Sequence, residues 1–190
     1  MHIQRSFVIL DRDGTLNVDR HYLADANDLE LLPGVGLGLR RLRALGLGLV
    51  VVTNQSAIGK GIIDHDKLDE IHARLRMLLL DEDIELDGIY ACPHDPDKDG
   101  PCYCRKPAPG LIEDAVNDLG FDPKASFMIG DSSSDIECGR GVGAFTILVR
   151  TGYGTETEKR DDVFPDKVVD DFEAASRLIE SELALDPDRM

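Results

Sequence analysis

The stretch Phe7–Thr15, with the sequence FVILDRDGT, determines how the rest of the chain is interpreted. Four apolar residues that stop at an acid are typical of a buried strand ending in a loop. In an open parallel sheet, ligands bind outside the carboxyl ends of the strands, so Asp11 and Asp13 stand where such a sheet binds its ligand. Gly14 allows a sharp turn there. A solvated strand end would have the same pattern, so the other strands must decide between the two interpretations.

Length and charge narrow the class of protein. A chain of 190 residues suits one domain with its own hydrophobic core, and we expect residues 1–190 to form a single domain. The 37 acidic and 21 basic residues give a net charge of −16, which repels nucleic acid and anionic membrane surfaces. We find neither a signal-peptide pattern nor an apolar run long enough to span a membrane. We therefore expect no nucleic-acid and no membrane partner.

Strand-like and helix-like segments alternate along the chain. Apolar runs predict strands at residues 7–10, 47–52, 88–91, 127–130, 144–149 and 167–169. Apolar residues at helical spacing predict helices over 35–45, from the N-cap Asp64 to about 78, from 107–109 to 119, around 135–139, and over 172–185. This alternation predicts an α/β fold with a doubly wound parallel sheet. We expect irregular or exposed loops at 95–101 and 151–162 and fraying at 186–190.

Polar residues follow four of the predicted strands, at what should be one edge of the sheet. These residues are Asp11 and Asp13, Thr53, Arg105 and Lys106, and Asp131 with Asp135. Each could be a cap or a solvated charge. Packing, however, does not require polar groups at every strand end, so the full set indicates a site.

The set matches the needs of phosphoryl transfer. We expect the Asp11 carboxylate to attack phosphorus and form an acyl phosphate, which water then hydrolyses. Asp13 would protonate the leaving oxygen and later accept a proton from water. Thr53 and Lys106 would hold the phosphoryl oxygens as charge spreads over them.

Carboxylates beside a phosphate also require a hard divalent cation. We expect Mg²⁺ there, bound by the side chains of Asp11 and Asp131 at about 2.0–2.1 Å and by the backbone carbonyl of Asp13.

A second group of ligand-type residues consists of Cys92, His94, Cys102 and Cys104. Three thiolates and an imidazole form a complete tetrahedral set for Zn²⁺. Two ligand pairs joined by a short loop are typical of a closed, structural site. Since residues 95–101 contain no large apolar side chain, a metal would order this zinc loop, residues 92–104. A chance cluster of reduced thiols is the alternative.

The motifs together resemble those of the haloacid dehalogenase superfamily of phosphatases. The resemblance rests on Asp-x-Asp-Gly-Thr at 11–15, Thr-Asn at 53–54, Lys-Pro at 106–107 and Gly-Asp-x-x-x-Asp at 130–135. It implies a three-layer, Rossmann-like sheet. Larger members insert a cap domain after the first or second motif, but residues 16–52 and 56–91 leave no room for one. We therefore expect a capless member, in which the zinc loop serves as a miniature cap.

Further segments resemble one family of that superfamily, the D-glycero-D-manno-heptose 1,7-bisphosphate 7-phosphatases. These segments are 12–15, 19–22, 51–56, 86–90, 92–94, 104–107 and 150–152, and segments 17–19 and 86–90 favour the heptose enzymes over their nearest relatives. The resemblance implies a cytoplasmic enzyme that acts on a small sugar bisphosphate in the pathway to nucleotide-activated heptose. Histidinol-phosphate phosphatases share the zinc loop and stay open as an alternative.

The same resemblance implies which residues bind the substrate. These are Asp19, Arg20, His21 and Tyr22 in one loop, Asn54, Gln55 and Ser56 after the second strand, and Arg105. The chain departs from the family at Ser132, where the family often has lysine. This difference removes a cation near the metal or the phosphate.

A different class of protein, the phospho-accepting receiver module, has a similar set of residues. Receiver modules of signalling proteins also combine an aspartate nucleophile with Mg²⁺, threonine and lysine. Their phosphorylated aspartate follows the third strand, where this chain has Cys92, Pro93 and His94 instead.

No large apolar helix face is left over, so we expect a monomer.

Overall fold

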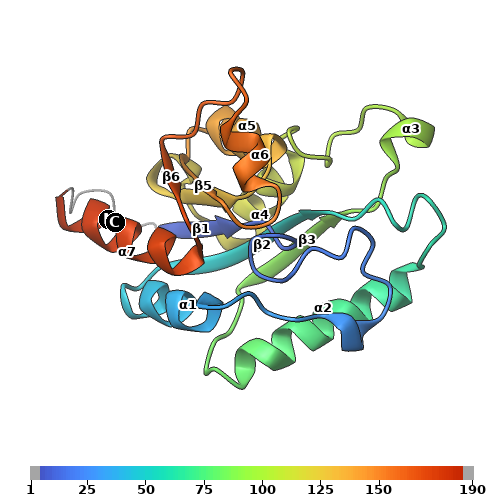
Figure 1. The fold of residues 1–190 in the computed structure, drawn as a ribbon, viewed down its shortest axis with the longest axis horizontal. Helices are drawn as coiled ribbons and strands as arrows, with labels where there is room; N and C mark the ends of the chain where they lie inside the picture. Colours follow the sequence, from blue (N-terminus) through green and yellow to red (C-terminus); the bar gives the residue numbers. More distant parts are fainter. Residues whose placement is uncertain (1–4, 186–190) are drawn as a thin grey trace.

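The computed structural model describes residues 5–185 and contains one sheet of six parallel strands (Figure 1). The strands are β1 (Phe7–Leu10), β2 (Gly48–Asn54), β3 (Gly88–Cys92), β4 (Phe127–Gly130), β5 (Phe145–Val149) and β6 (Lys167–Val169). Their order is β3-β2-β1-β4-β5-β6, so the direction of winding reverses at β1. The crevice outside β1 and its neighbours is therefore the expected ligand site. The predicted fraying at 186–190 lies outside the described residues.

Helices cover both faces of this sheet and make three layers, as predicted. The helices are α1 (Val35–Ala44), α2 (His65–Leu80), α3 (Pro96–Asp99), α4 (Gly110–Leu119), α5 (Ser133–Val142), α6 (Gly154–Glu158) and α7 (Phe172–Leu185), with single 3-10 turns at Ala26–Asp28 and Pro123–Ala125. Figure 1 shows α1 and α2 below the sheet, with α4 and α5 above it. One apolar cluster joins α1, α2 and α7 to the lower face, and a second joins α4 to the upper face.

Strand β1 shows why the apolar runs lack alternation. Val8 and Leu10 point into the lower cluster, while Phe7 and Ile9 point into the upper one. All four residues are buried. A parallel strand covered on both faces needs apolar residues throughout, which confirms the prediction for the first strand.

The predicted helix boundaries are also confirmed at several ends. The Asp64 carboxylate accepts a hydrogen bond from the backbone N–H of Lys67 and caps α2. Gly120 ends α4 in the left-handed conformation, with φ of 69°.

Three segments differ from the sequence-based expectation. The loop 95–101 contains the short helix α3, which Asp95 caps and Pro96 begins. The segment 151–162 contains the short helix α6, whose first residue, Gly154, packs so closely on the carbonyl of Val149 that a Cβ atom would lie 1.7 Å from its oxygen. Helix α5 exceeds the predicted 135–139, because a capping box starts it at Ser132.

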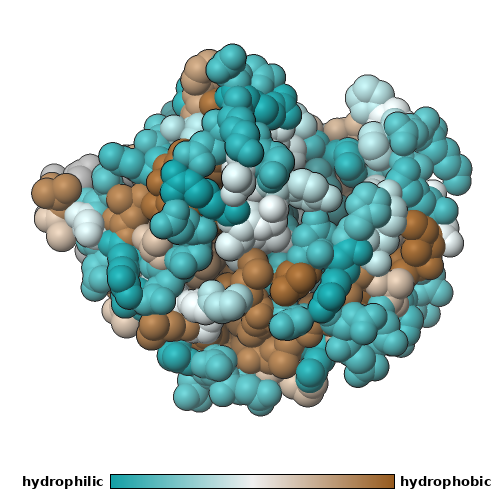
Figure 2. All heavy atoms as spheres, in the orientation of Figure 1, coloured by the Kyte–Doolittle hydropathy of each residue, from teal (hydrophilic) through white to brown (hydrophobic). Residues whose placement is uncertain are grey.

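The surface agrees with the acidic composition. Figure 2 shows a face that is mostly hydrophilic, with apolar residues in smaller groups. Among residues 5–185, none of the helices is both long and apolar enough to cross a membrane.

Candidate active site

The winding of the sheet brings the predicted acids together. Strands β1 and β4 are neighbours, and the backbone N–H of Asp11 donates to the carbonyl of Ile129 at 3.0 Å. Asp11 and Asp131 therefore leave adjacent strands side by side. Thr53 lies near the end of β2, on the other side of β1, and is buried. The expected convergence of strand ends is thus confirmed.

Lys106 lies at the centre of this group although it is far away in sequence. Its Nζ lies 2.6 Å from Asp11 Oδ1 and 2.6 Å from Asp135 Oδ1, and donates to the carbonyl of Val52 at 2.7 Å. The Asn54 side chain holds the Lys106 backbone at both its N–H (3.0 Å) and its carbonyl (3.1 Å). Burial opposes the ammonium charge, but the two carboxylates outweigh it and raise the pKa of Lys106.

The carboxylates exceed the local positive charge. Burial, followed by the charge of Asp135, raises the pKa of Asp11 despite the neighbouring Lys106. Burial, together with the charges of Asp11 and Asp135, likewise raises the pKa of Asp131. The carboxylate oxygens of these three acids lie within 4.8 Å of one another. Three buried carboxylates around one ammonium favour binding of a hard divalent cation, so this donor set fits Mg²⁺.

Asp135 differs from the other two acids in its remaining contacts. One oxygen accepts hydrogen bonds from the backbone N–H (3.0 Å) and hydroxyl (2.6 Å) of Ser132, and the other lies against Lys106. Both oxygens therefore have protein partners, and Asp135 orients the lysine. Its place in the Gly-Asp-x-x-x-Asp motif was the available signal, but the sequence did not reveal this role.

The carboxylate of Asp13 has three side-chain partners. Arg12 donates at 2.8 Å, Asn17 at 2.9 Å and Gln55 at 2.8 Å. Burial alone would raise the pKa of Asp13, but the charge of Arg12 and these hydrogen bonds lower it. Arg12 itself is 0% exposed, although an arginine between two aspartates suggests a solvated charge. Gln55 also donates to Thr53 Oγ1 at 2.8 Å, so one amide group connects Asp13 with Thr53, two of the predicted catalytic residues.

Two glycines form a close-fitting cradle around Asp131. A Cβ atom on Gly14 would lie 2.3 Å from Asp131 Oδ2, and one on Gly152 would lie 2.0 Å from it. Both glycines have positive φ, 79° and 53°. The Thr151 hydroxyl donates to the carbonyl of Gly14 at 2.6 Å, which ties the two segments together. Sequence reasoning gave Gly14 a turn but missed this contact, because it depends on a segment far away in the chain.

A cavity of about 160 Å³ connects these groups. It is lined by Asp11, Asp13, Asp19, His21, Thr53, Asn54, Lys106, Asp131, Ser132, Ser134, Asp135 and Tyr153. The predicted catalytic residues all line it, as do three of the predicted substrate residues.

The other predicted substrate residues lie outside this cavity. Arg20 pairs with Glu30 on the surface, Tyr22 contacts the ring of His21, and Arg105 donates to the carbonyl of His94. Gln55 lies behind Thr53 and Asp13, and Ser56 also lies outside the lining.

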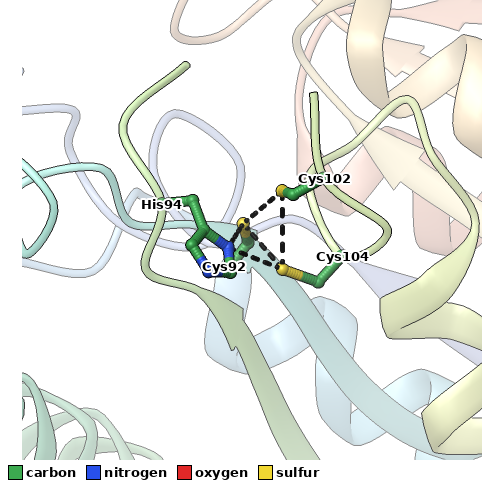
Figure 3. Close-up of side chains that lie close together, drawn as sticks. All are labelled: Cys92, His94, Cys102 and Cys104. Atoms are coloured by element: carbon green, nitrogen blue, oxygen red, sulfur yellow. Dashed lines mark hydrogen bonds between the residues drawn. The ribbon is translucent and has the colours of Figure 1, made fainter. Parts of the chain in front are cut away.

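The four metal-type residues of the zinc loop converge on one point (Figure 3). The Sγ atom of Cys102 lies 3.6 Å from that of Cys92 and 3.7 Å from that of Cys104, close to the edge of about 3.8 Å expected for a tetrahedron with Zn–S bonds of about 2.3 Å. The Cys92 and Cys104 sulfurs are closer, at 2.9 Å. His94 Nδ1 faces Cys104 Sγ at 3.2 Å. All four cysteines of the chain are free of disulfides, so the cluster can bind a metal.

Hydrogen bonds fasten the zinc loop to the segment after β2. The Gln55 N–H donates to the carbonyl of Cys92 at 2.7 Å, and the Gly59 N–H donates to that of Pro93 at 2.9 Å. Lys60 Nζ pairs with the buried carboxylate of Asp95 at 2.9 Å. The metal-type cluster therefore supports residues 55–60 as well as its own loop.

The chain resembles proteins of known name. Residues 103–175 match a family model described as HAD-hydrolase-like. The chain is 41% identical over 157 residues to a D-glycero-beta-D-manno-heptose-1,7-bisphosphate 7-phosphatase of Photorhabdus laumondii, which covers 80% of this chain and 84% of that protein. It is also 41% identical over 172 residues to the protein of that name from Haemophilus ducreyi, covering 86% and 94% of the two chains.

Solved structures agree with the sequence relatives. The D,D-heptose 1.7-bisphosphate phosphatase of B. bronchiseptica, complexed with magnesium and phosphate, matches with a TM-score of 0.87 and 31% identity. The match covers 93% of this chain and 99% of that one. The corresponding phosphatase of Burkholderia thailandensis matches with a TM-score of 0.71 and 27% identity, covering 93% and 99%.

Proposed function

The chain belongs to the D-glycero-beta-D-manno-heptose-1,7-bisphosphate 7-phosphatase family of HAD-like hydrolases, and we propose that it removes the 7-phosphate of D-glycero-D-manno-heptose 1,7-bisphosphate. The observation that carries the proposal is the buried contact of 2.6 Å between Lys106 and Asp11 inside the acid-lined cavity. A carboxylate and an ammonium side by side provide a nucleophile and an electrostatic clamp for a phosphoryl group.

In the proposed first step, an Asp11 carboxylate oxygen attacks the phosphorus of the 7-phosphate. The bond between phosphorus and the sugar oxygen breaks, and Asp13 gives that oxygen its proton. The product on the protein is an acyl phosphate of Asp11. In the second step, Asp13 takes a proton from water as the water oxygen attacks phosphorus, which releases phosphate and restores Asp11.

The surroundings of Asp13 suit the second step before substrate arrives. Its lowered pKa keeps it an ionised base in the free protein, held by Arg12, Asn17 and Gln55. A phosphate dianion bound next to it would raise this pKa, because a nearby negative charge disfavours ionisation. Substrate binding would thereby supply the protonated form that the first step requires.

Thr53 and Lys106 would hold the phosphoryl oxygens as negative charge moves across them. We assign the Mg²⁺ ligands to the side chains of Asp11 and Asp131 and the backbone carbonyl of Asp13. When bound, the ion supplies charge neutralisation for the phosphoryl group beside the carboxylates. We also assign Zn²⁺ to Cys92, His94, Cys102 and Cys104 in a structural role.

The predicted substrate residues fall into two groups, those that line the cavity and those that lie outside it. Asp19, His21 and Asn54 line the cavity and would contact the 7-phosphate end of the sugar. Arg20, Tyr22, Gln55, Ser56 and Arg105 lie outside it and would contact the substrate indirectly or at its far end. We further propose that residues 1–190 are one domain, acting as a monomer in the cytoplasm.

Phosphate release from a panel of substrates tests the function. The panel contains both anomers of D-glycero-D-manno-heptose 1,7-bisphosphate, histidinol phosphate and fructose 1,6-bisphosphate. We expect the highest kcat/KM for one heptose anomer, with release of only the 7-phosphate. A higher kcat/KM for histidinol phosphate would reject the heptose assignment but keep the phosphatase chemistry.

A further inference from the structure

The segment Thr151–Gly154 is fixed against the active site more firmly than its surface position suggests. The Tyr153 N–H donates to Asp131 Oδ2 at 2.7 Å, and the Thr151 hydroxyl donates to the carbonyl of Gly14 at 2.6 Å. The glycines on either side of Tyr153 admit no larger side chain. A Cβ atom on Gly152 would meet Asp131 Oδ2 at 2.0 Å, and one on Gly154 would meet the carbonyl oxygen of Val149 at 1.7 Å.

Tyr153 is therefore the side chain of this segment best placed to reach the substrate. Tyr153 is among the residues that line the cavity and is nevertheless 52% exposed, which places the residue at the cavity mouth. Its hydroxyl makes no hydrogen bond to any of residues 5–185. The backbone contact with Asp131 fixes the base of the ring relative to the reacting phosphoryl group.

The size of the cavity indicates which part of the substrate lies next to Tyr153. A volume of about 160 Å³ is below the range of about 300–1,000 Å³ typical of pockets that enclose whole ligands. A sugar bisphosphate whose reacting phosphoryl group lies beside Asp11 therefore extends out of the cavity. The sugar ring of a bisphosphate must then lie at the mouth, beside Tyr153.

We infer that Tyr153 is a specificity-determining residue whose aromatic face packs against the C–H face of the substrate's sugar ring. This inference rests on the proposed function. A sugar ring has apolar C–H surfaces between its hydroxyl groups, and an aromatic ring offers them a large flat area with little conformational entropy to lose. The contact forms with the sugar and not with the phosphoryl group, so it should affect sugar binding and leave the chemical step unchanged.

The test compares Tyr153→Ala and Tyr153→Phe with the wild type, using the heptose bisphosphate as substrate and inorganic phosphate as competitive inhibitor. For Tyr153→Ala we expect KM to rise by about threefold to tenfold with kcat within about twofold. The inhibition constant of inorganic phosphate, which has no sugar, should stay unchanged. Tyr153→Phe should behave like the wild type, because the ring face is kept.

A matched control is Phe164→Ala, since Phe164 is 61% exposed and lies outside the cavity lining. It should change neither KM nor kcat. An unchanged KM in Tyr153→Ala would overturn the inference, as would an equal loss in Tyr153→Phe or a weaker affinity for inorganic phosphate. Failure of the wild type to hydrolyse the heptose bisphosphate would instead reject the proposed function, because that measurement does not involve Tyr153.

Discussion

The two metal-type clusters of this chain are built in opposite ways. In the acid cluster, Asp11 and Asp131 follow the buried strands β1 and β4, Asp135 lies in the first turn of α5, and Lys106 comes from the loop before α4. Ion pairs and a glycine cradle hold the cluster together. The zinc loop follows β3 and has only a four-residue helix inside it. The strands and α5 position the carboxylates of the acid cluster. In the zinc loop, by contrast, the backbone is expected to take its conformation from the bonds that its side chains make to a metal. Metal loss should therefore impair chemistry at the first cluster and structure at the second.

The largest expected effect is that of Asp11→Asn. Losing the nucleophile should lower kcat by a factor on the order of 10⁴ or more, while the strands beneath keep the fold. Phosphate release measures the loss, and circular dichroism measures the fold. Substantial residual turnover in a folded variant would contradict the nucleophile role.

Lys106→Ala should lower kcat by about 10²–10³, the effect of removing one preorganised oxyanion donor. Steady-state kinetics would measure it, with Lys124→Ala as the control because Lys124 is an exposed lysine. A loss below tenfold in kcat would show that Lys106 does not stabilise the transition state.

Removing the metal from the zinc loop should act locally. We expect faster amide hydrogen exchange in residues 93–105 and, through the Lys60 and Gly59 contacts, in residues 55–60. Strands β1 and β4 should stay protected. Cys102→Ser should reproduce the change, whereas Cys138→Ser, outside the cluster, should keep one metal per chain by elemental analysis. Equal loss of protection across the sheet would remove the distinction between the two clusters.

The smallest expected effect is a pH-dependent shift in Tm. The pKa of Asp11 is raised to about 7 and that of Asp131 to about 8, so the folded state holds more protons than the unfolded state between about pH 4 and about pH 8. Without metal, stability should fall as pH rises through these values. Mg²⁺ binds the ionised carboxylates and should offset the loss.

At a hundredfold excess over its Kd, Mg²⁺ should raise the free energy of unfolding by about 2.7 kcal/mol. Each kcal/mol should raise Tm by about 2–4 °C in a chain of this size. It should be present at pH 8 and nearly absent at pH 5. Calorimetry at both pH values measures it, and equal shifts at the two would argue against the buried carboxylates as ligands.

Sequence reasoning succeeded where one local pattern determines the outcome. The apolar run at β1 and the cap at Asp64 depend on neighbouring residues, and both were predicted. The bond of Lys106 to Asp135 and the burial of Arg12 depend on segments brought together by folding. Lysine and aspartate look like solvated charges until the partner is known, so such contacts had no signal of their own.

The amide of Asn54 has a consequence for how new substrate preferences can arise. It bonds the Lys106 peptide at both its N–H and its carbonyl, much as a neighbouring strand would. The lysine is thereby anchored to β2 and depends little on the loop that leads to it. Changes in the loop between His94 and Cys102 that keep the metal-type residues would leave these two bonds intact, and Lys106 would keep its place beside Asp11. The sequence of this part of the loop can therefore vary without moving the lysine away from the acids.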